Sequence, residues 1–97
     1  MKPYCANRLT VVGRTKEIAR FKTKYEPDYL GLALLENSRT RVAWQFETGE
    51  PPISEIIQLS TLWHSLVLLL DYDREDRRIK GLVRAKAGAL QHHLVRY

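Results

Sequence analysis

Apolar and polar positions alternate most regularly between residues 41 and 47. Val42, Trp44 and Phe46 fall on one side of an extended chain, and the residues between them are polar, charged or small. Successive side chains of a β-strand point to opposite faces, so the pattern predicts a strand with one buried face. The short apolar run 9–12, closed by Gly13, predicts a strand before it, and residues 29–35 predict another that turns at residues 36–38.

A helix is expected between the first two of these strands. Ile18, Phe21 and Tyr25 recur at the spacing of one helix face. Thr15 is a suitable N-cap, and the helix must end near Pro27.

A second helix is expected after the turn at residues 49–52. Pro52 suits the first position of a helix. The segment that follows carries an apolar stripe at helical spacing, and His64 and Ser65 end it. The stripe consists of Ile53, Ile56, Ile57 and Trp63.

The C-terminal third begins with residues 66–72, which are apolar on both faces and predict a strand covered, at least in part, on both sides. Residues 73–76 read as a charged turn. The remainder predicts a hairpin of residues 79–87 and 90–95 with a break at Gly88. A helix is the alternative, because residues 82–94 include several helix formers. The hairpin is favoured, because Gly81 and Gly88 would both weaken a helix.

The predicted order is β-α-β-β-α-β followed by a hairpin. It indicates one α+β domain with a ferredoxin-like split βαβ architecture, in which two helices pack on one face of an antiparallel sheet. The core of this domain would span about residues 7–72 and the C-terminal β-hairpin extension about 77–97. Its interior is expected to contain Ile18, Phe21, Trp44, Phe46, Ile56 and Trp63.

Charge is segregated along the 97 residues, which carry a net charge of +5. Residues 1–25 and 74–97 are strongly basic, whereas residues 26–73 hold eight acidic and two basic side chains. This asymmetry indicates either an oriented electrostatic surface or simple solubility. Two basic sets are candidate binding residues: Lys16, Arg20 and Lys24 along one side of the first helix, and Lys80, Arg84 and Lys86 on one face of the first hairpin strand.

Short motifs resemble the YubB ferredoxin-like domain family of small plasmid-type and phage-type proteins. Residues 7–13 resemble the opening of that family, and residues 44–52 resemble its aromatic-Thr-Trp-x-Pro-Pro segment. Further matches follow in the expected order at Leu59-Ser60, Tyr72 and Gly81. One departure is Gly49, where the family often has a second tryptophan, so any pocket that this tryptophan covers is missing or reshaped. The resemblance implies a ferredoxin-like fold, an origin in a mobile genetic element and no catalytic residues.

The sequence offers little chemistry for catalysis or for a cofactor. The single cysteine, Cys5, cannot form an internal disulfide and reads as a small buried side chain. His92 and His93 would point to opposite faces of a strand, so no metal site is expected. The carboxylates between residues 71 and 76 read as a solvated turn. We therefore expect no enzyme and no cofactor, and the sequence identifies no small-molecule substrate.

The chain is expected in a reducing cytoplasm, because it contains one cysteine, no secretory signal and no apolar run near the roughly 18 residues that span a bilayer. Base stacking on the sheet is disfavoured, because Trp44 and Phe46 should face the helices and leave Arg8, Thr10, Arg41, Ala43 and Gln45 on the open face.

The sequence is compatible with two functions. The first is an interaction domain that binds a protein, either a host factor such as a defence-system component or its own copy, through the exposed edge of the hairpin. The alternative is sequence-nonspecific nucleic-acid binding through the basic side of the first helix, with contacts that weaken with salt.

Overall fold

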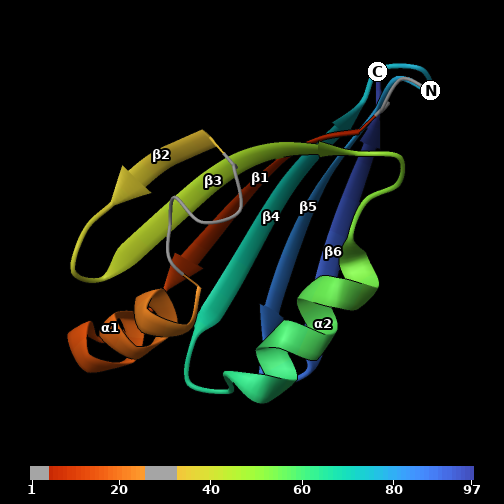
Figure 1. Ribbon diagram of the computed structural model, residues 1–97. Coiled ribbons are helices and arrows are strands. Elements are labelled where there is room, and N and C mark those ends of the chain that lie inside the picture. Colours follow the sequence, from red (N-terminus) through yellow and green to blue (C-terminus); the bar gives the residue numbers. More distant parts are fainter. Residues whose placement is uncertain (1–4, 26–32) are drawn as a thin grey trace.

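The computed structural model describes residues 5–25 and 33–97, which form an α+β fold with one six-stranded sheet and two helices (Figure 1). The elements, in chain order, are β1 (Cys5–Val12), α1 (Thr15–Lys24), β2 (Ala33–Asn37), β3 (Arg41–Thr48), α2 (Ile53–Leu62), β4 (Val67–Arg74), β5 (Ile79–Lys86) and β6 (Ala89–Arg96). The strands lie in the order β2-β3-β1-β4-β5-β6, and every neighbouring pair is antiparallel.

One face of the sheet is apolar across its middle strands. Leu9 lies opposite Trp44 on β3 and Leu70 on β4, and these side chains are 5–8% exposed or fully buried. The prediction that Trp44 points inward is confirmed, and Phe46 on the same face packs against the core while remaining partly exposed.

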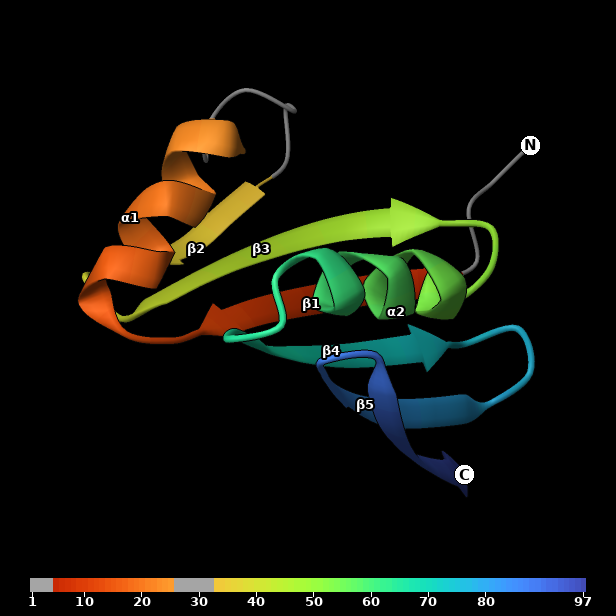
Figure 2. The same cartoon turned by 90° about the horizontal axis from the view of Figure 1, so that it is seen from below.

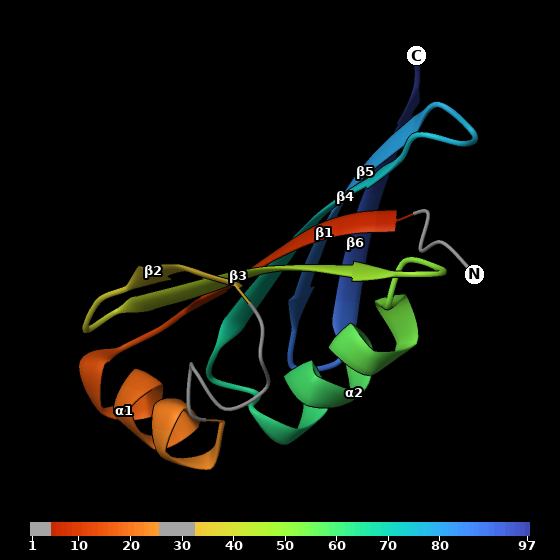
Figure 3. The ribbon, with the colours of Figure 1, turned by 45° about the horizontal axis from the view of Figure 1, so that its top comes forward.

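Both helices lie on this apolar face, here called the helix side; the other is called the open face (Figures 2 and 3). Phe21 of α1 lies 6.0 Å from Trp44 and 5.3 Å from Trp63, measured between ring centroids. Burial of an aromatic side chain of this size stabilises the fold by about 1.5–3 kcal/mol. The six expected core residues all belong to this layer: Ile18, Phe21, Trp44 and Ile56 are buried, and Phe46 and Trp63 pack against them.

The C-terminal segment is a hairpin, so the helical alternative is wrong. β5 and β6 are joined by Ala87 and Gly88, whose φ angles are 51° and 81°. Positive φ at both central residues is the signature of the tight turn that matches the twist of paired strands, and glycine adopts it without strain. The hairpin continues the same sheet, because β5 pairs with β4 along its length.

Several predicted boundaries shift. β1 begins at Cys5 instead of residue 9. The N-cap position of α1 is Arg14 and not Thr15, which is the first helical residue, and no described side chain caps the helix by a hydrogen bond. β2 continues to Asn37, where a turn was predicted, whereas the predicted strand residues 29–32 lie outside the described residues.

The predicted charged turn at residues 73–76 is also wrong by two positions. Asp73 and Arg74 complete β4, and the turn occupies residues 75–78. The strand continues because its alternate side chains, Tyr72 and Arg74, are buried on the helix side while the two aspartates stay on the open face. Within the described residues, no helix is long and apolar enough to cross a membrane.

Candidate interaction surfaces

The open face carries a shallow groove of about 510 Å³ near one end of β1. The side chains that line it on this face have mixed charge: Ala6, Arg8, Gln45, Asp71, Asp73 and Lys80. As expected, the open-face positions of β1 and β3 carry no aromatic ring, because Trp44 and Phe46 lie on the opposite side. These strands therefore offer no platform on which bases could stack.

Contacts with Tyr97 occupy one end of this face. The Tyr97 hydroxyl donates a hydrogen bond of 2.6 Å to Asp73 Oδ1. Lys80 Nζ lies 5.3 Å from the centroid of the same ring, within the range of a cation–π contact. The hydrogen bond to Asp73, which requires the phenol proton, raises the pKa of Tyr97 to about 12. Lys80 is thus engaged by its own chain.

The two predicted basic sets are exposed, but the fold separates them. Lys16, Arg20 and Lys24 are exposed on α1, which lies on the helix side. Lys80, Arg84 and Lys86 are exposed on the open face of β5, opposite the buried Gly81, Val83 and Ala85. The six residues therefore do not form one surface that could follow a nucleic-acid backbone.

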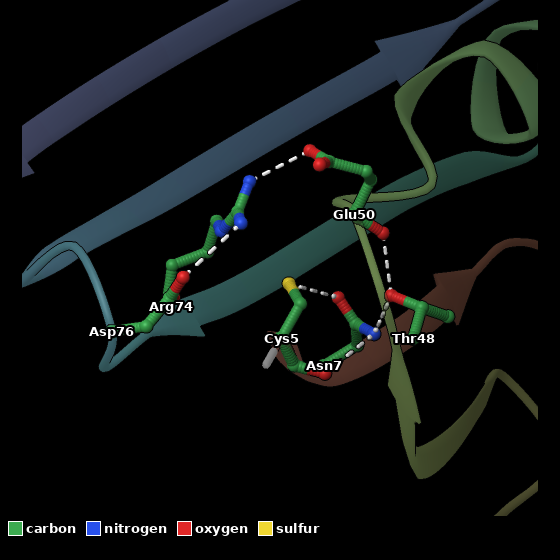
Figure 4. Close-up of polar contacts among 6 residues, drawn as sticks. All are labelled: Cys5, Asn7, Thr48, Glu50, Arg74 and Asp76. Carbon is green, nitrogen blue, oxygen red and sulfur yellow. Dashed lines mark hydrogen bonds and ion pairs between the residues drawn. The ribbon is translucent and has the colours of Figure 1, made fainter. Parts of the chain in front are cut away.

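A polar cluster lies on the helix side at the end of the sheet where β1 begins (Figure 4). Cys5 Sγ donates to Asn7 Oδ1 at 3.3 Å, and Asn7 Nδ2 donates to Thr48 Oγ1 at 2.9 Å. The Thr48 hydroxyl donates in turn to the backbone carbonyl of Glu50 at 2.5 Å. The cluster joins the start of β1 to the turn between β3 and α2.

Arg74 ties the same turn to β4. Its guanidinium contacts Glu50 at 2.7 Å and Asp76 at 3.4 Å, and its side chain is 9% exposed. Arg74 Nε is buried and has no hydrogen-bond partner among the described residues. Burial raises the pKa of the neighbouring Cys5 thiol. The neutral thiol is a poor nucleophile, so the arrangement is suited to holding the turn in place.

The other residues considered for catalysis or metal binding lie on two separate strands, β4 and β6. Asp71 and Asp73 belong to strand β4 and not to a solvated turn. His92 and His93 lie on adjacent positions of β6 and face opposite sides, as predicted. In the described ranges 5–25 and 33–97, no group of three or more His, Cys, Asp or Glu side chains could hold a metal ion.

β6 forms one edge of the six-stranded sheet. All eight residues of this strand are exposed, and β5 alone lies beside it among the described strands. Tyr97 N donates to Arg78 O at 2.8 Å in continuation of the β5–β6 ladder. Bonding residues alternate in an antiparallel pair, so the odd-numbered residues of β6 bond to β5. The backbone N–H and C=O groups of four residues consequently point outward: Leu90, His92, Leu94 and Arg96.

The side chains of these four residues lie on the helix side. Leu90 is 37% exposed and Leu94 is 49% exposed. Between them, His92 Nε2 is hydrogen-bonded at 2.6 Å to the hydroxyl of Tyr72, whose ring lies over Gly81. The edge thus presents Leu90 and Leu94, both partly exposed, on either side of the His92 imidazole, which the Tyr72 hydroxyl holds in place.

The other edge of the sheet is protected in a way that β6 is not. β2 has five residues and a register shift between Leu34 and Glu36. β6 has eight residues in unbroken register with β5, contains no proline or lysine, and has Arg96 as its one permanently charged residue. Short length, bulges, prolines and lysines are the usual means by which edge strands avoid pairing.

The sequence-based interpretation identified this edge but missed the residues that form it. The sequence contained a signal for these residues, because Leu90 and Leu94 fall on one face of an extended strand and Gln91 and His93 fall on the other. Comparison with known proteins adds no assignment: no family model, curated protein or solved structure matches the chain.

Proposed function

We propose that the chain is a non-enzymatic interaction domain that binds an extended segment of a protein at the edge of β6. The observation that carries the proposal is the regular, nearly uncharged edge of eight residues, whose outward backbone groups face no other strand of residues 5–25 and 33–97. An added strand would complete these hydrogen bonds, as in the β-augmentation mode of peptide recognition. Leu90 and Leu94 would supply the apolar contacts.

Strand addition also accounts for the contrast between the two sheet edges. The polar cluster is a weaker candidate for a functional site, because its one cysteine, Cys5, is buried and has a raised pKa. The groove on the open face is shallow and partly engaged by Tyr97. The β6 edge, by contrast, has a regular row of outward backbone groups with no strand beside them among the described residues.

A ferredoxin-like core is part of the same proposal. The element order βαββαβ and the strand order β2-β3-β1-β4 support it, with β5 and β6 as the appended hairpin. The resemblance to the YubB family, and the mobile-element origin that it implies, belong to the proposal too. At Gly49, where that family often has tryptophan, an added Cβ would meet nothing within 4 Å among the described residues.

The experiment compares His92→Pro with His92→Ala. The immobilised protein selects binders from a library of random short peptides, and their affinities for both variants are measured. Proline removes the outward N–H of residue 92 without removing a bond to β5, and edge strands tolerate it there. Alanine keeps that N–H while losing the same imidazole, so it is the matched control. We expect peptide binding to survive in His92→Ala and to be lost in His92→Pro. Equal affinity for the two variants would contradict strand addition.

Nucleic-acid binding through α1 is the second candidate, because Lys16, Arg20 and Lys24 are all exposed along that helix. It predicts a mobility shift with DNA or RNA that weakens as salt rises. Lys16→Glu combined with Arg20→Glu should remove that shift without loss of folding, since both side chains lie in solvent. A shift that persists in the double variant would exclude α1 as the site.

A further inference from the structure

We infer that the segment bound at the β6 edge is β6 of a second copy of this chain, paired antiparallel about a twofold axis at His92. The inference rests on the proposed strand addition and names its partner. A homodimer with one shared patch requires an edge that is complementary to itself. The sequence of β6 meets this requirement in one register.

The register follows from the spacing of the leucines. With the axis at His92, Leu90 of each copy lies opposite Leu94 of the other, and both pairs lie on the helix side. Moving the axis to Gln91 or His93 would place both leucines opposite a polar or charged residue or beyond the end of the strand. Burial of apolar surface therefore favours the axis at His92.

The apolar rows of the two sheets also become continuous in this register. Within one copy, Leu90 lies beside Ala85 and Leu94 beside Gly81, over which the ring of Tyr72 is placed. Pairing Leu90 with Leu94 of the other copy extends this row across the axis. Leucines that are 37% and 49% exposed in one copy thereby gain neighbours.

Charge does not oppose the pairing, although the chain as a whole carries +5. Residues 89–95 contain no Lys, Arg, Asp or Glu. Arg96, at the end of the strand, would lie opposite Gly88 of the other copy, where no side chain stands. On the open face, Gln91 would lie opposite His93, and Ala89 opposite Val95. No Lys, Arg, Asp or Glu side chain is brought opposite one of like charge.

Disulfide trapping tests the register. Gln91 and His93 of different copies form a pair whose backbone groups do not bond across the axis, and Cα atoms at such positions are about 4.5 Å apart. This separation is within the range of a disulfide, about 4.4–6.8 Å. The native Cys5 is 1% exposed and is not expected to react.

Gln91→Cys and His93→Cys proteins are prepared separately and oxidised mildly, alone and as an equimolar mixture. The inference predicts a disulfide-linked dimer in the mixture and little in either protein alone, because residue 91 does not lie opposite itself. Light scattering of the unmodified protein should show a mass approaching twice 11.3 kDa as its concentration rises, and Leu94→Lys should remain a monomer.

Cross-linking of Gln91→Cys alone as readily as in the mixture, or no cross-link in the mixture, would overturn the inferred pairing. The comparison of His92→Pro with His92→Ala separates this failure from failure of the proposed function. If the mixture does not cross-link but peptide binding still depends on the N–H of residue 92, self-pairing is wrong and strand addition stands. If neither result is obtained, both are wrong.

Discussion

The contact between Gly81 and Tyr72 predicts a large effect from one methyl group. A Cβ added at Gly81 would overlap Cζ, Cε1 and Oη of the Tyr72 ring. Tyr72 is 5% exposed, and its hydroxyl is hydrogen-bonded to His92 on β6. The ring would have to move, and the link from β4 to the edge strand would be lost with it.

The magnitude of the Gly81→Ala effect follows from two contributions. Overpacking a buried site costs about 1–3 kcal/mol, and the lost hydrogen bond costs about 0.5–1.5 kcal/mol. We expect Gly81→Ala to lower the free energy of unfolding by about 1.5–4.5 kcal/mol. Tyr72→Phe, which removes the hydroxyl alone, should lower it by about 0.5–1.5 kcal/mol.

Urea unfolding followed by the fluorescence of Trp44 and Trp63 measures these free energies. The Tyr72→Ala background provides the decisive comparison, because the methyl group at position 81 then has space. Gly81→Ala should cost little in that background, which gives a coupling of about 1.5 kcal/mol or more between the two positions. An equal cost in both backgrounds would refute the close approach of the ring to Gly81.

Two further predictions concern titration. The raised pKa of Tyr97 means that its hydrogen bond to Asp73 stabilises the fold fully below pH 10 and is lost as the pH rises through about 12. Ultraviolet titration should show a phenol absent from Tyr97→Phe that ionises near pH 12, and Asp73→Asn should shift it toward 10; no change in Asp73→Asn would contradict the assignment. Burial should keep the Cys5 thiol unreactive toward a disulfide reagent until denaturant is added, and fast labelling of the native protein at neutral pH would show that the polar cluster is open.

The fold was predictable where a local pattern determines the structure. Alternation between residues 41 and 47 fixed the inward side of β3, and Gly88 with its positive φ marked the hairpin turn. The N-cap of α1 was not predictable, because it depends on whether the Thr15 hydroxyl can reach a backbone N–H. The end of β4 was misplaced because the charged run 73–76 suggested a solvent-exposed turn, although Tyr72 and Arg74 continue the buried row.

The positions of the candidate surfaces could not be predicted from any single segment, because they depend on how distant segments pack and pair. Exposure of the six basic residues could be predicted from helix and strand periodicity. Their separation onto opposite sides of the sheet follows from where α1 packs and from the pairing of β5 with β4. The outward backbone groups of Leu90, His92 and Leu94 depend on which residues of β6 bond to β5, and the two-residue turn sets this parity.

Residue-resolved amide hydrogen exchange of β6 tests the central claim most directly. In dilute protein, the amides of residues 90, 92, 94 and 96 should exchange rapidly, while those of residues 91, 93 and 95 are protected by β5. On binding a selected peptide, or on raising the protein concentration, the first set should become protected. A complex that forms without added protection at these amides, or with protection along β2 instead, would contradict strand addition at β6.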